Sequence, residues 1–254
     1  MINKGCGFRH SSFIICNTWE DITLDSFIQK FQQNFIDDNR YMYLLEGLGN
    51  TLLITFLAIL LGVVLGFLIA IIRSTYDKND RKSLLLRILN IIANIYLTII
   101  RGTPVMVQLL IMYYVIFVSM DKITVAVLAF GINSGAYVAE IVRSGIMSID
   151  QGQFEAGRSL GFSYPQTMVY IIMPQAFKNV LPALANEFIV LLKETSICGY
   201  IGLMDLTRGG DIIRSVTYEA FLPLIAVALI YLVMVMILSA LVKKLERRLR
   251  GSER

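Results

Sequence analysis

Five long apolar segments constrain the fold of this 254-residue chain more than any other feature. They cover residues 48–72, 84–118, 123–142, 180–197 and 221–242. A helix rises about 1.5 Å per residue, so about 20 apolar residues cross the roughly 30 Å hydrocarbon core of a bilayer. Hydrophobic residues make up 56% of the chain, well above the share in a soluble domain. The sequence therefore predicts an all-α integral membrane protein.

The second segment is interrupted by Arg101-Gly102-Thr103-Pro104. It either reverses there and forms two spans, or is one broken helix whose first half lies at the interface. With five spans, fourteen of the 23 Lys and Arg residues share one side with residues 73–87, residues 151–176 and the C-terminus, and seven lie on the other side. A sixth span would divide these charges poorly. Because cytoplasmic loops are rich in Lys and Arg, we predict five spans, an external N-terminus and a cytoplasmic C-terminus.

Residues 1–40 form a tail that these patterns determine least. The first residues lack the apolar core of a signal peptide, so they could be a disordered extension or lie upstream of the true start. Further on, apolar residues recur at helical spacing: Leu24, Phe27, Ile28, Phe31 and Phe35. This spacing predicts an amphipathic helix on the membrane surface over residues 24–36. Residues 41–254 are assigned to a transmembrane domain.

Glycines and cysteines outside these elements indicate packing rather than chemistry. Gly62 and Gly66 form a GxxxG pair in the first span, which favours close contact with another helix, either within the chain or across a dimer. A charged loop is expected over residues 73–87. The cysteines Cys6, Cys16 and Cys198 lack metal-ligand spacing, and we interpret Cys198 as a small apolar residue at a helix end. The one histidine, His10, lies in the tail, so no metal site is predicted.

A polar segment, residues 151–176, separates the third and fourth spans. Its first helix should hold Glu155, Ala156 and Gly157. Gly161 is placed to end that helix, because glycine adopts the left-handed conformation without steric cost. A folded polar segment between two spans indicates a docking surface.

A second short helix should follow within the same segment. Ser163 is a candidate N-cap, and Gln166 lies three residues later, as in a capping box. Pro165 is tolerated because the first helical N–H groups have no partner within the helix. Pro174 is expected to stop this second helix.

These residues resemble the EAA signature of ATP-binding cassette (ABC) importer permeases. That signature is Glu-Ala-Ala, three residues, Gly, nine residues, Ile, one residue and Leu-Pro. It reads here as Glu155-Ala156-Gly157, Gly161, Ile171 and Met173-Pro174, with Gly157 in place of the second Ala and Met173 in place of Leu. The segments IIRGTPVMVQLL, GAYVAEIVRSGI, LLKETS and GLMDLTRGG are similar to the polar amino acid branch of these permeases, the histidine/glutamine/arginine type. The resemblance runs from about residue 41 to the C-terminus.

The resemblance implies the type I ABC importer permease fold, with five core helices, in a bacterial cell membrane. It implies a dimer with a second copy or a paralogue, and an extracytoplasmic solute-binding protein that delivers an amino acid. A coupling region, residues 143–178, would dock on a cytoplasmic ATPase through Glu155, Ala156, Gly157, Gly161 and Pro174. ATP and Mg²⁺ would bind the ATPase, because this chain has no GxxxxGK[ST] phosphate loop and so is not an enzyme itself. The net charge of +4 does not indicate nucleic acid, since the basic residues lie at helix ends.

Ionisable groups within the spans are candidates for the substrate pathway, because a charge at membrane depth usually faces a bundle interior or a cavity. The candidates are Arg101, Glu140, Glu187, Lys193 and Glu194, with Tyr137 and Asn133 as weaker ones. Alternatively, Arg101 and Glu140 form a structural or gating pair and Glu187 lies near an interface.

The break after Arg101 is a second candidate part of that pathway. At Gly102, Thr103 and Pro104 the helix would leave backbone groups unpaired, which is tolerated where the backbone lines a cavity. Opposite Glu194, Thr195 and Ser196, the break could supply donors for a substrate carboxylate and acceptors for its ammonium group.

Residues 199–217 are expected to form a Gly-rich outer loop with alternating charges, Asp205, Arg208, Asp211 and Arg214. The loop either contacts the solute-binding protein or is simply solvated. Two other functions stay open: a permease of this architecture for another small solute, and an ion-coupled secondary transporter. The second usually contains internal repeats, and none is visible here.

Overall fold

The computed structural model describes residues 24–78 and 83–251, and these residues form helices and short connections without a strand. Five of the described helical segments are long and apolar enough to cross a membrane: Tyr41–Asp77, Leu84–Gly102, Lys122–Met147, Tyr164–Ile201 and Phe221–Leu249. The predicted count of five spans is therefore confirmed. Cys6, Cys16 and His10 lie outside the described residues.

The first span, α2 (Tyr41–Lys78), packs along the third, α5 (Lys122–Met147), through small residues. A Cβ added to Gly62 would lie 3.0 Å from Ser134 Cβ, and one on Gly66 would lie 2.5 Å from Val138 Cγ1. The GxxxG pair thus allows two backbones to approach within one chain, which confirms ordinary packing as its role.

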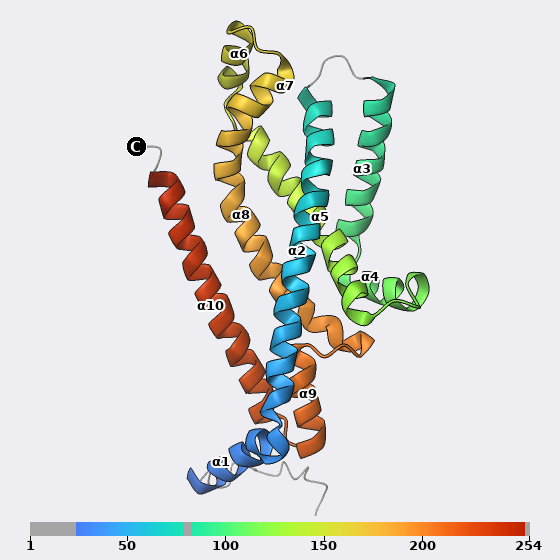
Figure 1. Cartoon of the computed structure of the whole chain (residues 1–254), viewed down its shortest axis with the longest axis vertical. Helices are drawn as coiled ribbons and strands as arrows, with labels where there is room; N and C mark the ends of the chain where they lie inside the picture. Colours follow the sequence, from blue (N-terminus) through green and yellow to red (C-terminus); the bar gives the residue numbers. More distant parts are fainter. Residues whose placement is uncertain (1–23, 79–82, 252–254) are drawn as a thin grey trace, which may run out of the picture.

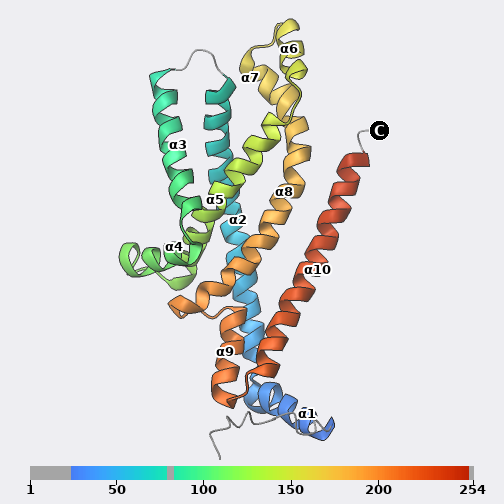
Figure 2. The same ribbon diagram turned by 180° about the vertical axis from the view of Figure 1, so that it is seen from behind.

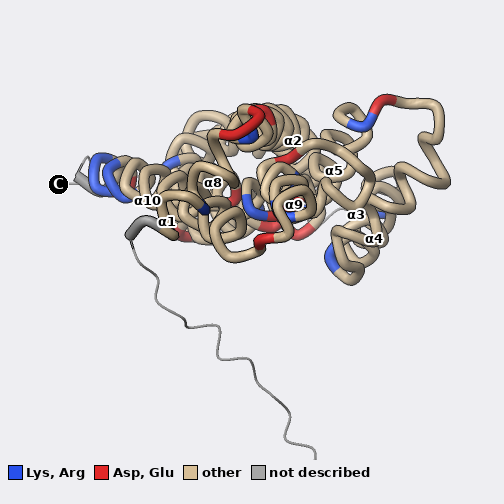
Figure 3. The backbone as a smooth tube through the Cα atoms, turned by 90° about the horizontal axis from the view of Figure 1, so that it is seen from below, with Lys and Arg blue, Asp and Glu red and all other residues tan. Residues whose placement is uncertain are grey.

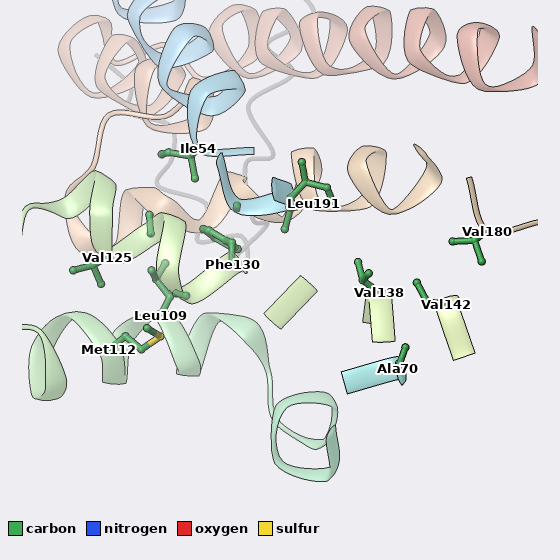
Figure 4. Packing of buried hydrophobic residues seen from close by; sticks show 14 of the residues in the cluster. Ile54, Ala70, Leu109, Met112, Val125, Phe130, Val138, Val142, Val180 and Leu191 are labelled. Atoms are coloured by element: carbon green, nitrogen blue, oxygen red, sulfur yellow. The ribbon is translucent and has the colours of Figure 1, made fainter. Parts of the chain in front are cut away.

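The main apolar core lies where α2 and α5 meet α8 (Met173–Glu194) and α4 (Val105–Ile111). Ile54, Leu109, Phe130 and Leu191 are completely buried in it, one from each helix. Figure 4 shows these side chains directed toward a common interior. Apolar burial between the helices therefore fixes the positions of α2, α5 and α8.

The second span, α3 (Leu84–Gly102), begins at an N-cap: Ser83 Oγ accepts from the N–H of Leu86 at 3.2 Å. It ends at the break, and α4 follows with a π-helical turn, Met112–Ile116. The half that is long enough to span is thus the first, so its length does not favour the alternative of an interfacial first half. Its 19 residues can cross a bilayer, whereas residues 105–116 are too few.

The expected charged loop over residues 73–87 is mostly helix. α2 continues to Lys78 and α3 begins at Leu84. The basic residues of this segment are compatible with helix because Arg73, within α2, donates to Glu140 Oε1 of α5 at 2.6 Å.

The expected loop over residues 199–217 is also wrong. A 3₁₀ helix, Thr195–Ile201, leads into α9 (Leu206–Thr217). The glycines that suggested a loop instead allow close packing: a Cβ on Gly209 would lie 2.5 Å from the carbonyl oxygen of Tyr43. Cys198 is buried and unpaired among the described residues, as expected of a small apolar residue.

The tail helix α1 (Leu24–Phe31) continues into a π-helical stretch, Gln32–Ile36, so the predicted helix over residues 24–36 is confirmed. Phe27, Ile28 and Phe31 are exposed, whereas Phe35 is buried beside α9. A position on the membrane surface stays a prediction.

The two ends of the bundle carry different elements (Figures 1 and 2). α6 (Gln151–Ser159) and α7 (Tyr164–Thr167) lie at one end together with the neighbouring ends of α2 and α3, and α1 and α9 lie at the other. The last span, α10 (Phe221–Gly251), points its C-terminal end toward the α6 end. Figure 3 shows Lys and Arg gathered at that end of α10, and charges of both signs around α9. The side of the membrane on which each end lies stays a prediction.

Candidate functional site

The polar segment between the third and fourth spans folds as two short helices. Asp150 caps α6, and its Oδ1 accepts from the N–H of Gly152 at 2.6 Å. At the other end Gly161 has φ +80°, and its N–H donates to Arg158 O at 3.0 Å. The N–H of Phe162 donates to Gly157 O at 3.1 Å, which completes a Schellman cap. The predicted end of α6 at Gly161 is confirmed.

One face of α6 packs on the protein and the other is open. Phe154 and Gly157 are buried, whereas Glu155 and Ala156 are exposed. A Cβ on Gly157 would lie 2.6 Å from Thr167 Cγ2 and 3.2 Å from Ile171 Cδ1. The departure from the second Ala of the EAA pattern therefore has a steric reason: this chain has Thr167 where a methyl group at position 157 would lie.

The second short helix, α7, has the predicted cap. Ser163 is its N-cap, and the Ser163 N–H donates to Gln166 Oε1 at 2.8 Å. The expected stop at Pro174 is wrong. Pro174 lies at the start of α8, directly after the π-helical turn Met168–Ile172, and helical structure continues from Tyr164 to Ile201.

A cavity of about 510 Å³ with several charged and polar lining residues lies among α3, α5 and α8; we call it the central cavity. Four predicted pathway residues line it: Arg101, Tyr137, Glu140 and Glu187. The Arg101 guanidinium lies 5.7 Å from the centre of the Tyr137 ring, within the range of a cation–π contact. The structure thus brings together both signs of charge on one cavity wall.

Glu140 is surrounded by arginines from three helices. Its Oε1 lies 2.6 Å from Arg73 Nη1 and 3.8 Å from Arg101 Nη1, and its Oε2 lies 3.7 Å from Arg143 Nε. Arg143 also donates to Asp77 Oδ2 at 2.9 Å. The alternative of a structural pair is therefore present, but the close partner of Glu140 is Arg73 rather than Arg101.

Glu187 has a different setting on the same cavity. Its Oε1 accepts from the Ser134 hydroxyl at 2.9 Å, and no cation of the described residues forms an ion pair with it. Ser134 is completely buried, and Glu187 is 9% exposed. A carboxylate held by one neutral donor retains acceptor capacity toward the cavity.

Hydrogen bonds pair several backbone carbonyls at the break after Arg101. Gln108 Nε2 donates to Ile100 O at 2.8 Å and to Thr103 O at 3.1 Å. Gln108 Oε1 in turn accepts from Asn133 Nδ2 at 3.0 Å. The N–H groups of Val107 and Gln108 donate to Pro104 O at 3.0 and 3.2 Å. The expectation of unpaired carbonyls is therefore wrong for Thr103 and Pro104.

The remaining pathway candidates lie away from the central cavity. Glu194 is half-buried, and the hydroxyl of buried Thr195 donates to Leu192 O at 2.8 Å. Ser196 lines a separate cavity of about 330 Å³ with Arg208 and Asp211 of α9. No cavity that we describe joins Ser196 to Arg101.

The outer helix α9 carries two aspartates with opposite pKa shifts. Burial raises the pKa of Asp205, the N-cap of α9, to about 6, although its carboxylate accepts from the N–H groups of Thr207 and Arg208. The side-chain hydrogen bond from Arg214, at 2.5 Å, lowers the pKa of Asp211. Among the residues described, no group of His, Cys, Asp and Glu is arranged to hold a metal ion.

Several residues of these sites were not among the sequence candidates: Arg73, Gln108, Ser134, Arg143, Ser148 and Asn179. Gln108 carried a usable signal, because it is the one strongly polar side chain in the apolar run 105–118. The others lie near span ends or are small, so only the packing of α5 on α2 and α8 reveals them.

Three comparisons place the chain among known proteins. Residues 62–251 match the family described as binding-protein-dependent transport system inner membrane component. The chain is 39% identical over 214 residues to a putative glutamine transport system permease protein of Rickettsia typhi, covering 83% of this chain and 94% of that protein. It is 39% identical over 216 residues to the arginine transport system permease protein of Bacillus subtilis, with the same coverage.

Solved structures agree in fold. The crystal structure of an amino acid ABC transporter with histidines matches with a TM-score of 0.75 and 42% identity, covering 90% of this chain and 99% of that one. The MetNI methionine ABC transporter matches with a TM-score of 0.71 at 19% identity, over 82% of this chain and 97% of that one. The predicted ABC importer permease fold is confirmed, and the chain belongs to the family of inner membrane components of binding-protein-dependent transport systems.

Proposed function

We propose that this chain is the permease subunit of an ATP-driven importer for polar amino acids. The observation that carries the proposal is α6: a capped helix outside the spans, anchored by buried Phe154 and Gly157, with Glu155 and Ala156 exposed. The names of relatives that carry glutamine and arginine support the class of substrate.

The exposed face of α6 is the proposed contact with a cytoplasmic ATPase subunit, which binds ATP and Mg²⁺. Glu155 and Ala156 contact the ATPase. Gly157 allows α6 to pack against Thr167, and Gly161 ends α6. Pro174 starts α8, so a displacement of α6 and α7 passes into a span. A helix with both ends fixed transmits such a displacement better than a loop would.

The central cavity is the proposed substrate site. Arg101 offers guanidinium donors to the carboxylate of an amino acid, and Glu187 offers an acceptor to its ammonium group. Tyr137 orients Arg101 through the cation–π contact. Glu140 holds the arginines in position and does not bind the ammonium group, because Arg73 already neutralises it.

The end of the molecule that carries α9 is the proposed outer side. Arg208, Asp211 and Arg214 form an exposed charged row there, which suits contact with a solute-binding protein. Ser196 lines the cavity beside α9 and is proposed to line the entry, with Glu194 and Thr195 next to it in the chain. A second permease copy or paralogue completes the complex.

The test uses the complex of permease, ATPase and solute-binding protein in proteoliposomes. A polar amino acid should stimulate ATP hydrolysis and accumulate inside, and Glu155→Lys combined with Gly161→Pro should abolish both. Glu46→Lys, the same charge reversal at an exposed residue near the other end of α2, serves as the control. Transport driven by an ion gradient without ATPase would identify a secondary transporter instead. Stimulation only by a solute that is not an amino acid would leave the permease role and remove the substrate.

A further inference from the structure

Polar cavities continue from the central cavity toward the α6 end of the molecule. A second cavity of about 350 Å³ is lined by Ser148, Asp150, Gln175 and Lys178. We call it the lower cavity because it lies beyond the central cavity on the proposed cytoplasmic side, at the end that Figure 1 draws at the top. A third, of about 400 Å³, lies between α8 and α10 and is lined by Asn186 and Glu246. One residue, Asn179, lines all three cavities.

The three cavities form a polar tract, and its lining on α5 and on α8 comes from one face of each helix. On α5 and its C-cap the residues are Tyr137, Glu140, Ser144 and Ser148. On α8 they are Gln175, Asn179, Ala183 and Glu187. Steps of three and four residues keep side chains on one helical face. The tract therefore runs along facing stripes of α5 and α8 from Glu187 to Asp150.

A hydrogen bond lies at the boundary between the central and lower cavities. Asn179 Nδ2 donates to Ser148 Oγ at 3.1 Å, and both residues line both cavities. The Ser148 hydroxyl itself donates to Gly145 O at 2.8 Å. The pair joins α8 to the end of α5 across the tract.

The helices also pack tightly beside this pair, at Gly145. A Cβ on Gly145 would lie 2.2 Å from Val180 Cγ2 and 3.5 Å from Ala176 O. The absence of a side chain at Gly145 thus allows α5 and α8 to pack closely at this point. A rotation about this crossing would separate Ser148 from Asn179, which lie just beyond it.

The pair is directly connected to α6. Ser148 is the C-cap of α5 and Asp150 is the N-cap of α6, with only Ile149 between them. From the α8 side, Gln175 Nε2 donates to Gln153 Oε1 of α6 at 3.3 Å. A displacement of α6 therefore acts on both partners of the hydrogen bond.

We propose that Ser148 and Asn179 form the inner exit gate of the permease. The substrate leaves the central cavity between them and enters the lower cavity, and displacement of α6 opens the pair. A hydroxyl and an amide suit this position, because they exchange hydrogen bonds with a zwitterion but do not retain it as a fixed charge would. The inference rests on the proposed transport function and assigns its exit route.

The first test cross-links the gate. Cys6 and Cys16 are replaced by Ser, and Ser148→Cys and Asn179→Cys are introduced together in the complete complex. After oxidation, amino acid uptake should fall about tenfold or more, and a reductant should restore it. Each single variant, oxidised in the same way, should transport as before oxidation. A disulfide verified by mass spectrometry together with unchanged uptake would overturn the proposal.

A matched pair controls for the effect of any cross-link. Thr217 Oγ1 donates to Asn34 Oδ1 at 2.8 Å, a hydroxyl–amide contact at the opposite end of the molecule. Asn34→Cys combined with Thr217→Cys should oxidise without loss of uptake. An equal loss in both pairs would mean that a disulfide anywhere stops the protein, and would refute a gate at Ser148.

The second test does not need a transported substrate. Asn179→Cys alone is labelled with a charged, membrane-impermeant thiol reagent from the ATPase side, without nucleotide and with ATP plus vanadate. The labelling rate should change about fivefold or more between the two states. An equal rate in both states would overturn the gate. Failure of the wild-type complex to transport any amino acid would instead overturn the proposed function, so the two failures are distinguishable.

Discussion

Two short helices outside the spans, α6 and α9, begin alike and are held differently. Each starts at an aspartate N-cap, Asp150 for α6 and Asp205 for α9. Asp150 is exposed, whereas Asp205 is completely buried. The N–H of Leu206 donates to Thr51 Oγ1 of α2 at 3.1 Å, which fixes the start of α9 to the first span.

The atoms that contact the two helices also differ: backbone atoms contact α9, and side chains contact α6. Gly209 of α9 meets backbone atoms of α2, while Gly157 of α6 meets the Thr167 and Ile171 side chains. Side chains can yield by a rotamer change, but backbone cannot. The comparison indicates that α9 is a fixed part of the bundle and that α6 can move with modest cost.

The largest expected effect comes from Gly209→Ala in α9. The added Cβ would lie 2.5 Å from Tyr43 O, so α2 or α9 must shift. We expect a loss of about 3 kcal/mol or more of stability, at the upper end of overpacking, measured by thermal unfolding of the purified permease. Gly49→Ala is the control, because no atom lies within 4 Å of its added Cβ. Equal melting temperatures for the two variants would refute a fixed α9.

A pH effect on α9 is the next in size. The pKa of Asp205 is about 6, raised by burial, while its value in the unfolded chain is near 3.8. An acid whose pKa is higher in the folded state stabilises the fold. This contribution is complete when the pH is below the pKa of the unfolded chain, and it is lost as the pH rises through the folded pKa of about 6. Stability should therefore fall by up to about 3 kcal/mol between pH 4 and pH 7 from this group. Asp205→Asn should flatten the unfolding profile in that window, and an unchanged profile would exclude Asp205 as its source.

A smaller effect is expected for Gly157→Ala in α6. Its Cβ would lie 2.6 Å from Thr167 Cγ2 and 2.7 Å from Thr167 Oγ1, which are side-chain rather than backbone atoms. We expect the free energy of unfolding to fall by about 1 kcal/mol, at the low end of the range for an overpacked site. Thr167→Ala should recover it in the double variant, as measured by a double-mutant cycle. A cost equal to that of Gly209→Ala would remove the distinction between the two helices.

The smallest effect is expected for Asp150→Ala, which removes an exposed cap. Loss of the acceptor for the Gly152 N–H should cost about 0.5 kcal/mol of helix stability, the low end for an N-cap because Asp150 is exposed. Local hydrogen exchange of α6 is the measurement, since the whole protein need not melt earlier. Asp150→Asn keeps an acceptor and should exchange like the wild type.

Sequence reasoning succeeded where one pattern had one physical meaning. The apolar lengths indicated five spans, Gly161 indicated the end of α6, and Gly62 with Gly66 indicated a close helix contact. It failed where one residue type serves two purposes. Gly209 suggests a loop but permits packing on Tyr43, and Pro174 suggests a stop but starts α8.

The central cavity could be predicted only in part. Arg101, Glu140 and Glu187 are costly at membrane depth, so their charge alone marks them as candidates in the sequence. Their partners are not visible in this way: Arg73 is 67 positions from Glu140, and Ser134 is 53 from Glu187. Only the helix crossings decide which carboxylate is neutralised and which keeps a free acceptor.

The arginines around Glu140 have a consequence for the electrostatics of the membrane interior. Arg73 lies 2.6 Å from the Glu140 carboxylate, and Arg101 lies 3.8 Å from the same oxygen. If Arg101 turns away, Arg73 still compensates the carboxylate, so no bare negative charge remains among the helices. In the proposed function, Arg101 can therefore contact a substrate carboxylate while Arg73 still neutralises Glu140.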